Sequence, residues 1–359
     1  MNVLKRLPKC RAAFFVHTNC FRGLFVDFMK RALLPFCLLL FVPFSVFSRT
    51  NINFHASPAL EIVAGKIDES VYSSGGKKIS LLEWKQLPLC GISLSAGFCV
   101  SDFSFDAAFS YSLPLVSGSF EDSDWNLDGI KTCYSVHEER SVLNFSASVC
   151  MKYDFRLSSV FSFYPLVRSS FYYDSFSARN GSGRYGITSS TGLKNDVSWE
   201  SPYAKFYARL YGIDFSSQAF YTFTGIGFSA KPFARFSVSV DFSISPFVYS
   251  HFVDHHLDSF SSSDGGFSIR AVQKDFFKHF FARAEFLYSL TERFDFVVGM
   301  EYLFGSEIKG ETCFYEGFAK DYFSPSGQEA GHKAMRFDFS AGLRFSGSFI
   351  AGKKFCKAL

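Results

Sequence analysis

Apolar and polar residues alternate one by one over long stretches of this chain, and this alternation restricts the fold more than any other feature. Between residues 143 and 155 every second residue is apolar: Leu143, Phe145, Ala147, Val149, Met151, Tyr153 and Phe155. The positions between them hold polar or small residues. Because successive side chains of a β-strand point to opposite faces, this stretch predicts a strand with one apolar and one polar face.

The same pattern recurs along the chain from residue 92 onward. It is clearest at residues 103–111, 236–244 and 337–345. Further strands are expected at about 59–72, 78–99, 157–178, 214–229, 273–290 and 292–305. The sequence therefore predicts roughly ten strands in all and no convincing helix.

The longest apolar run, Leu33 to Phe47, follows Lys30 and Arg31, a layout typical of a secretory signal peptide. A membrane anchor is the alternative, although the run of about 15 residues is shorter than the roughly 20 that a spanning helix needs. Residues 1–28 would be an unusually long basic region before it, so translation is expected to begin at Met29. We predict a misassigned extension over 1–28, a signal peptide over 29–48, and an outer-membrane β-barrel with a short C-terminal tail over 49–359.

Many long two-faced strands after a signal peptide favour an antiparallel transmembrane β-barrel over a soluble β-sandwich. In lipid every backbone polar group must be paired, and only a closed ring has no free edge. Short connections are expected near residues 100–102, 154–156, 230–232 and 290–293, and long loops at about 114–140, 179–213, 251–270 and 306–333. Since the long loops of such barrels face the outside, we expect any chemistry at the extracellular rim.

The composition argues against two classes of function. The net charge is only +4 and is spread along the chain, so no nucleic-acid partner is predicted. The nine Cys form no CxxC pair or His-spaced cluster, so neither a zinc module nor another cofactor is predicted. Cys133 and Cys313 lie in loop-like stretches and could form a disulfide in an oxidising compartment.

Two short motifs could carry chemistry. In the first, Asp122 and Asp124 flank Ser123, so both carboxylates can point to one side of an extended segment. Crowding two carboxylates raises one apparent pKa, and such a pair can hold and polarise water. The structural alternative is a solvated turn, in which Asp and Ser are ordinary residues.

The second motif is Asp254-His255-His256. The Asp254 carboxylate could orient the His256 imidazole and stabilise its protonated form, which makes His256 a candidate general base. A metal site with His251 and His255 is the alternative, but adjacent His side chains of a strand point to opposite faces. The two motifs follow the third and seventh expected strands, so both should reach the same rim.

These motifs, with two earlier segments, resemble the omptin family of ten-stranded outer-membrane aspartyl-type endoproteases over about residues 59–345. The matching segments, in the family's order and spacing, are 65–72 (GKIDESVY), 75–85 (GGKKISLLEWK), 122–125 (DSDW) and 254–256 (DHH). The resemblance implies that Asp122 and Asp124 position a water, and that Asp254 and His256 form a dyad across the cleft. His256 would take a proton from this water as it attacks the scissile carbonyl, without an acyl intermediate or a metal.

The resemblance also implies a substrate preference. Glu69 matches an acid that lines the pocket for a basic residue, for which a lumen-facing strand acid is the structural alternative. Phe252 stands where omptins that cut between basic residues carry a second pocket acid. We therefore expect cleavage of polypeptides outside the cell near basic residues, with a relaxed preference.

Two further points bear on partners and on the rival function. Residues 175–179 match the family's Ser-Phe-x-Ala-Arg stretch, but the lipopolysaccharide-binding Tyr/Glu/Arg set just upstream is not reproduced, so lipopolysaccharide dependence is not carried over. The expected partners are outer-membrane lipid and polypeptide substrates. The rival function is a catalytically inactive barrel acting as an adhesin, receptor or pore, and roughly ten strands leave little open lumen for a pore.

Overall fold

The computed structural model describes residues 51–127, 129–186, 197–210, 212–257, 267–316 and 324–350. The expected N-terminal extension (1–28), the signal peptide (29–48) and the tail after residue 350 lie outside these residues. Among the residues described, no helix is long and apolar enough to cross a membrane. The barrel is the compact unit Asn53–Ser348.

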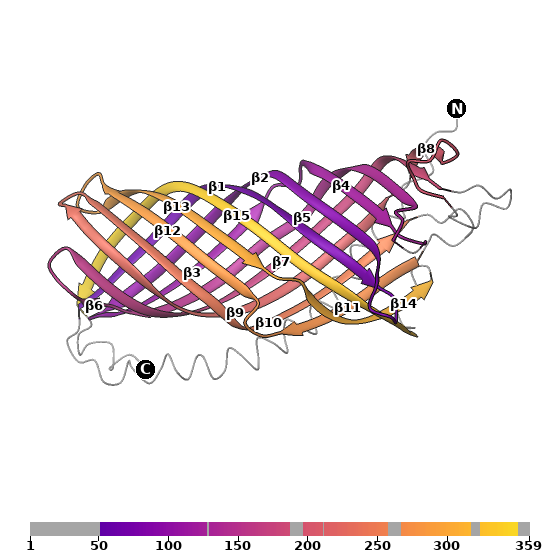
Figure 1. The fold of residues 1–359 in the computed structure, drawn as a ribbon. Coiled ribbons are helices and arrows are strands. Elements are labelled where there is room, and N and C mark those ends of the chain that lie inside the picture. The colour runs from indigo at the N-terminus through magenta and orange to yellow at the C-terminus, as the bar shows by residue number, and fades with distance from the viewer. Residues whose placement is uncertain are drawn as a thin grey trace, which may run out of the picture. The chain divides into compact units, whose positions relative to one another are not determined.

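All regular elements of the described chain are β-strands, and they form one antiparallel sheet that closes on itself (Figure 1). The strands are β1 (Asn51–Tyr72), β2 (Lys78–Val100), β3 (Phe103–Ser112), β4 (Val116–Asp124), β5 (Cys133–Tyr153), β6 (Phe155–Arg156), β7 (Phe161–Tyr185), β8 (Lys205–Leu210), β9 (Ile213–Phe233), β10 (Phe236–His256), β11 (Phe267–Asp275), β12 (His279–Ser289), β13 (Phe294–Gly305), β14 (Ile308–Glu316) and β15 (Ser324–Ile350). Pairing of β1 with β15 closes the ring.

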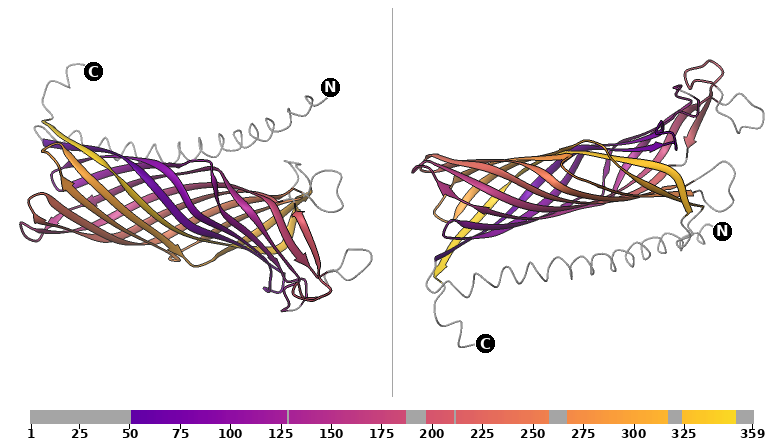
Figure 2. Two further views of the ribbon diagram at one scale, coloured as in Figure 1. Left: turned by 90° about the horizontal axis from the view of Figure 1, so that it is seen from above. Right: turned by 60° about the horizontal axis from the view of Figure 1, so that its bottom comes forward.

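Six of these strands share three positions of the ring, two strands end to end at each, and the short strands β6 and β8 only extend the sheet beside β7, so the ring has ten positions. β3 and β4 both lie between β2 and β5, β12 and β11 pair with successive parts of β10, and β13 and β14 pair with successive parts of β15. The strands wind obliquely around the barrel (Figure 2). The predicted antiparallel barrel of about ten strands is confirmed.

The predicted long loops are wrong in extent. β4 lies inside the predicted loop at 114–140, and β14 inside the loop at 306–333. β7 and β10 also run further toward the rim than expected. Of the predicted short turns, those at 100–102 and 290–293 are present, the one at 230–232 lies at 234–235, and the one at 154–156 is shifted to 157–160. The site motifs therefore lie on paired strands and not in loops.

The outward face changes character along the barrel. At the end that carries β6, it exposes large apolar side chains, among them Ile92, Leu94, Phe109, Phe228, Phe242, Phe280, Phe296 and Leu343. At the end that carries β4, β8, β11 and β14, charged side chains also occur on the outward face and form ion pairs, such as Lys66 with Glu83 and Lys85 with Glu121, beside a few exposed apolar ones such as Phe206. The apolar belt is the surface that lipid requires.

The strands are longer than a membrane needs. β5, β9 and β10 each have 21 residues, whereas a tilted transmembrane strand needs about 9–11. The part of each long strand beyond the apolar belt, together with β4, β8, β11 and β14, therefore lies outside the membrane. We call this the rim half, and it includes residues 66–72, 78–86, 117–124 and 248–256.

Inside the rim half, five aromatic side chains fill the barrel. Trp84, Phe120, Phe176, Phe215 and Phe252 come from β2, β4, β7, β9 and β10, and each is at most 1% exposed. The ring of Trp84 lies 4.2 Å from that of Phe120 and 5.1 Å from that of Phe215, centroid to centroid. We call this set the aromatic floor.

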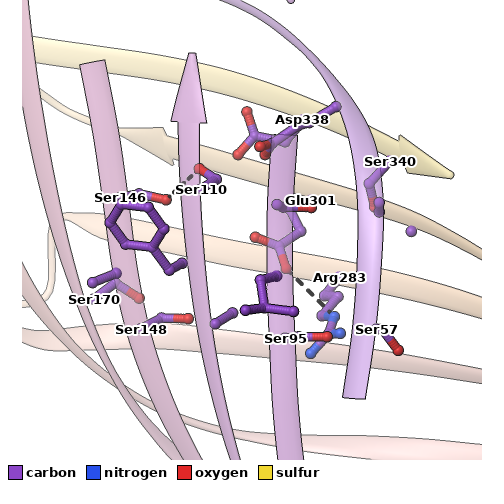
Figure 3. A pocket seen from close by; sticks show the side chains of 18 of the residues that line it. Ser57, Ser95, Ser110, Ser146, Ser148, Ser170, Arg283, Glu301, Asp338 and Ser340 are labelled. Atoms are coloured by element: carbon purple, nitrogen blue, oxygen red, sulfur yellow. Dashed lines mark hydrogen bonds and ion pairs between the residues drawn. The ribbon is translucent and has the colours of Figure 1, made fainter. Parts of the chain in front are cut away.

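At the level of the apolar belt, the interior is polar. A cavity of about 80 Å³ is lined there by serines and by charged side chains of both signs, including Arg283, Glu301 and Asp338 (Figure 3). Arg283 and Glu301 form an ion pair of 3.4 Å. None of the predicted site residues lines this cavity.

Candidate active site

The predicted catalytic residues lie on the inner face of the rim half, on two separate walls. Asp122 and Asp124 belong to β4, and Asp254 and His256 belong to β10. Three ring positions, those of β5, β7 and β9, separate the two walls in one direction and five in the other. Strand alternation points both members of each motif inward, because they are two residues apart.

Asp254 and His256 form the ion-pair geometry that the spacing predicted. Oδ2 of Asp254 lies 3.4 Å from Nε2 of His256, and Oδ1 accepts a hydrogen bond of 3.1 Å from the backbone N–H of Ile269 on β11. The Asp254 side chain is 2% exposed, whereas that of His256 is 21% exposed. The buried carboxylate is thus fixed through both oxygens, and the imidazole remains accessible.

Asp122 and Asp124 lie half-buried on β4, between β2 and β5. Asp122 is opposite Leu82 and Ser135, and the side chain of Ser80 donates a hydrogen bond to Asp124. Burial raises the pKa of both carboxyls, and that of Asp122 lies well above its usual range because the charges of Asp124 and Asp254 add to the effect. This pair therefore tends to retain a proton.

The two walls interact electrostatically across the mouth. The charge of Asp254 acts on Asp122, and the charge of His256 lowers the pKa of Asp124 against the effect of burial. Each acid of β4 thus interacts with one member of the dyad on β10. The structure brings the four side chains into one electrostatic cluster.

Glu69 and Phe252 lie next to this cluster. Nε1 of Trp84 donates a hydrogen bond of 2.6 Å to Oε1 of Glu69, whose side chain is almost fully buried on β1. Burial raises the pKa of Glu69 well above its usual range, the charge of Asp254 raises it further, and the Trp84 hydrogen bond partly offsets this. Phe252 lies two residues before Asp254 and packs against Phe215 at 6.2 Å.

Sequence reasoning did not assign a role to Trp84. It lies in the segment 75–85 that carries the resemblance, and its alternation with Glu83 and Lys85 places it on the inward face. Its hydrogen bond to Glu69 joins residues 15 positions apart. That partner depends on the pairing of β1 with β2, which no local pattern specifies.

The remaining candidates lie apart from the cluster. Nδ1 of His255 lies 2.5 Å from Oγ of Ser268, so this residue has a partner of its own. Among the described residues, no group of three or more His, Cys, Asp or Glu side chains is arranged to hold a metal ion. Cys133 is buried and Cys313 is half-buried, and both are free thiols, so the disulfide considered from the sequence is absent.

Comparisons with known proteins identify a family and a similar solved barrel. Residues 50–346 match the model of the Omptin family. The chain is similar to the crystal structure of the outer membrane protease OmpT from Escherichia coli, with a TM-score of 0.69 and 21% identity over 82% of this chain and 97% of that chain. The outer membrane protein OprG from Pseudomonas aeruginosa matches with a TM-score of 0.33 and 9% identity over 84% of this chain and 98% of that chain. No curated protein matches the chain.

Proposed function

Because the chain belongs to the omptin family of outer-membrane proteases, we propose that it is an endopeptidase whose catalytic groups are Asp122, Asp124, Asp254 and His256. The observation that carries this proposal is geometric: both motifs lie on the inner face of the rim half, and Oδ2 of Asp254 lies 3.4 Å from Nε2 of His256. In support, the charge of Asp254 raises the pKa of Asp122, and the charge of His256 lowers that of Asp124. An inactive adhesin or receptor would have no need to place two half-buried carboxyls on the wall opposite an Asp–His pair, because like charges withdrawn from solvent destabilise the fold.

The proposed reaction is direct hydrolysis by water. With the Nε2–H of His256 donated to Asp254, Nδ1 is the basic nitrogen and takes a proton from the water as its oxygen bonds to the scissile carbonyl carbon. The tetrahedral intermediate then breaks its C–N bond, and the imidazolium returns the proton to the leaving amine. One water is consumed for each bond cut, and the products are a carboxylic acid and an amine.

Asp122 and Asp124 would hold this water and the carbonyl oxygen. Oδ1 of Asp122 is buried and has no hydrogen-bond partner among the described residues, and a buried polar atom of this kind is costly unless a ligand or water engages it. A carboxyl that keeps its proton can donate a hydrogen bond to the developing oxyanion. The raised pKa of Asp122 supports this role.

We propose that the site faces the outside of the cell. The connections at the opposite end are short, such as Ser101–Asp102 and Ala234–Arg235, and in outer-membrane barrels short turns face the periplasm. The substrates are then extracellular polypeptides. Cutting near a basic residue, which the resemblance implies, would require Glu69 to be ionised, but the proposed chemistry does not depend on it.

The test uses His256→Ala and a matched control, His255→Ala. Refolded barrels are incubated with a mixed peptide library, and the cuts are mapped by mass spectrometry. We expect cutting by the parent and by His255→Ala, because His255 faces Ser268, and none by His256→Ala. Equal cutting by His256→Ala would refute the assignment, and a parent that cuts nothing would favour the inactive barrel.

A further inference from the structure

A second cavity, of about 20 Å³, lies inside the barrel beneath the aromatic floor. Two of its lining residues follow directly from the floor. On β2, Gln86 comes two residues after Trp84, and on β7, Asp174 comes two residues before Phe176. Because strand side chains alternate between faces, each lies on the inward face about 7 Å further from the rim end than its floor neighbour. The cavity is therefore the first space below the floor.

Four polar side chains line this cavity, and each brings one buried atom that has no hydrogen-bond partner among the described residues. These atoms are Nε2 of Gln86, Oδ1 of Asp174, Nε2 of His332 and Nη1 of Arg336. The four residues are at most 8% exposed. A buried polar atom is costly unless a ligand or a water engages it. Four such atoms on one small cavity indicate a binding site.

Arg336 and Asp174 are held at a separation that leaves space between them. Nε of Arg336 donates hydrogen bonds of 2.8 and 3.0 Å to the two oxygens of Asp338, which lines the larger cavity at the level of the apolar belt (Figure 3). Nη1 of Arg336 lies 3.8 Å from Oδ1 of Asp174. This distance is too long for a hydrogen bond, and it is the kind of polar gap that a water bridges.

His332 supplies a hydrogen-bond acceptor. Its Nδ1 lies 3.4 Å from Oγ of Ser250, and with the ring proton on Nδ1 and donated to this hydroxyl, Nε2 accepts. Burial and the charge of His279 lower the pKa of His332 to about 3, so the imidazole stays neutral. The ring packs against Phe252 of the aromatic floor at 6.0 Å.

We propose that this cavity binds one water molecule, which hydrogen-bonds to all four atoms. Gln86 and Arg336 each offer a donor, while Asp174 and His332 each offer an acceptor. A water accepts two hydrogen bonds and donates two, so it satisfies the set completely. Since one water needs about 10–15 Å³, the cavity has room for a single molecule. An anion would meet the charge of Asp174, and a cation that of Arg336.

This water joins strands that do not pair with one another. Its ligands come from β2, β7 and β15, which are not neighbours in the ring. They lie under Trp84, Phe176 and Phe252, the floor residues of β2, β7 and β10. The water is thus a polar tie across the barrel that supports the aromatic floor from below. This inference does not depend on the proposed function.

The direct test is a crystal structure of the refolded parent at a resolution that shows ordered waters. We expect one peak of density in the cavity, at about 2.7–3.2 Å from each of the four atoms. Two results would overturn the proposal. One is a cavity that holds no density, and the other is direct hydrogen bonding among Gln86, Asp174, His332 and Arg336 that closes it.

A pair of substitutions gives an independent test in solution. Gln86→Leu removes one ligand of the water and should raise the equilibrium constant for unfolding in urea by at least about fivefold. The matched control is Gln273→Leu, because Gln273 is also buried, its amide has no partner among the described residues, and it lines neither cavity. We expect this control to leave the constant unchanged or to lower it, since an apolar side chain replaces an unpaired amide. If Gln86→Leu stabilises the barrel as Gln273→Leu does, Gln86 has no water to lose and the proposal fails.

Discussion

Replacing Asp254 by Asn removes the negative charge of the Asp254–His256 dyad and keeps the size of the side chain. The Asn side chain has the same size, and its amide oxygen can still accept the hydrogen bond from the Ile269 N–H. Its amide group facing His256 donates and cannot accept. The Nε2–H of His256 therefore loses its acceptor, and the imidazole is held in the wrong tautomer for a base at Nδ1.

The size of the effect follows from the 3.4 Å separation between Oδ2 of Asp254 and Nε2 of His256. At an effective dielectric constant of about 20, unit charges at that distance attract by about 5 kcal/mol. The His256 side chain is 21% exposed, so solvent screening reduces the usable part to about 2–4 kcal/mol. Because the imidazolium forms only as the reaction proceeds, kcat should fall by about 30- to 1000-fold, with a small change in KM.

The assay is steady-state hydrolysis of a quenched peptide containing a site whose cutting depends on His256. Folding of Asp254→Asn is verified by gel migration of the unheated barrel, and we expect no loss of stability. The reason is that removing the Asp254 charge relieves its repulsion of Asp122 and Glu69. A folded Asp254→Asn enzyme with kcat within about threefold of the parent's would refute the role of this carboxylate.

Three further measurements test other contacts of the rim half. Because the pKa of Asp122 is raised in the folded barrel, this group gives stability that is present below its unfolded pKa and is lost as pH rises through its folded pKa. The Tm of Asp122→Asn should therefore exceed that of the parent by an amount that grows from pH 4 to pH 8. A Tm difference between variant and parent that stays constant over this range contradicts the raised pKa. Trp84→Phe should lower the free energy of unfolding in urea by about 1–3 kcal/mol, because Oε1 of buried Glu69 loses its hydrogen-bond donor. The same substitution should lower it by less in a Glu69→Leu background. Equal decreases in the two backgrounds would argue against the Trp84–Glu69 hydrogen bond. Burial raises the pKa of the Cys133 thiol to about 12, so iodoacetamide should label it only after heating, and early labelling would show that β5 opens.

The barrel could be predicted because its two faces meet different solvents. In the half that carries the apolar belt, Phe242 of β10 points outward and is 59% exposed, while neighbouring Asp241 and Ser243 are buried inside. Because lipid contacts the outer face and polar side chains fill the interior, apolar and polar residues alternate along each strand, and this alternation can be recognised in the sequence. The number of strands follows from counting such stretches.

The extent of the strands could not be predicted, because their phase changes between the two halves. In β10 a register shift between Ile244 and Phe247 moves even-numbered residues from the outer to the inner face, so Phe252 is buried. β5 shifts similarly between Ser141 and Leu143. Each shift breaks the alternation and resembles a strand end in the sequence, since one extra residue inverts the pattern.

The two site motifs could be found from the sequence because their spacing is local, whereas the residues that surround them in the barrel could not be predicted. The spacing of two within Asp122–Asp124 and Asp254–His256 survives because each pair lies wholly beyond the register shifts. The surroundings of Glu69 depend on which strands are neighbours and on their register, as its hydrogen bond from Trp84 and the effect of the Asp254 charge on its pKa show. The sequence therefore predicts which groups share a wall but not the charge state that the opposite wall imposes.

The change of phase also explains how one strand serves two purposes. In the lipid half, apolar side chains must point outward, which leaves polar ones inside and would leave a wet lumen below the site. In the rim half, water surrounds the barrel, so apolar side chains can turn inward, and the aromatic floor becomes possible. This floor excludes water from the base of the catalytic cluster, where low polarity strengthens the interaction of Asp254 with His256 and keeps a proton on the Asp pair. The register shift that inverts β10 is thus what places Phe252 inside as part of the floor and Asp254 beside it as part of the cluster.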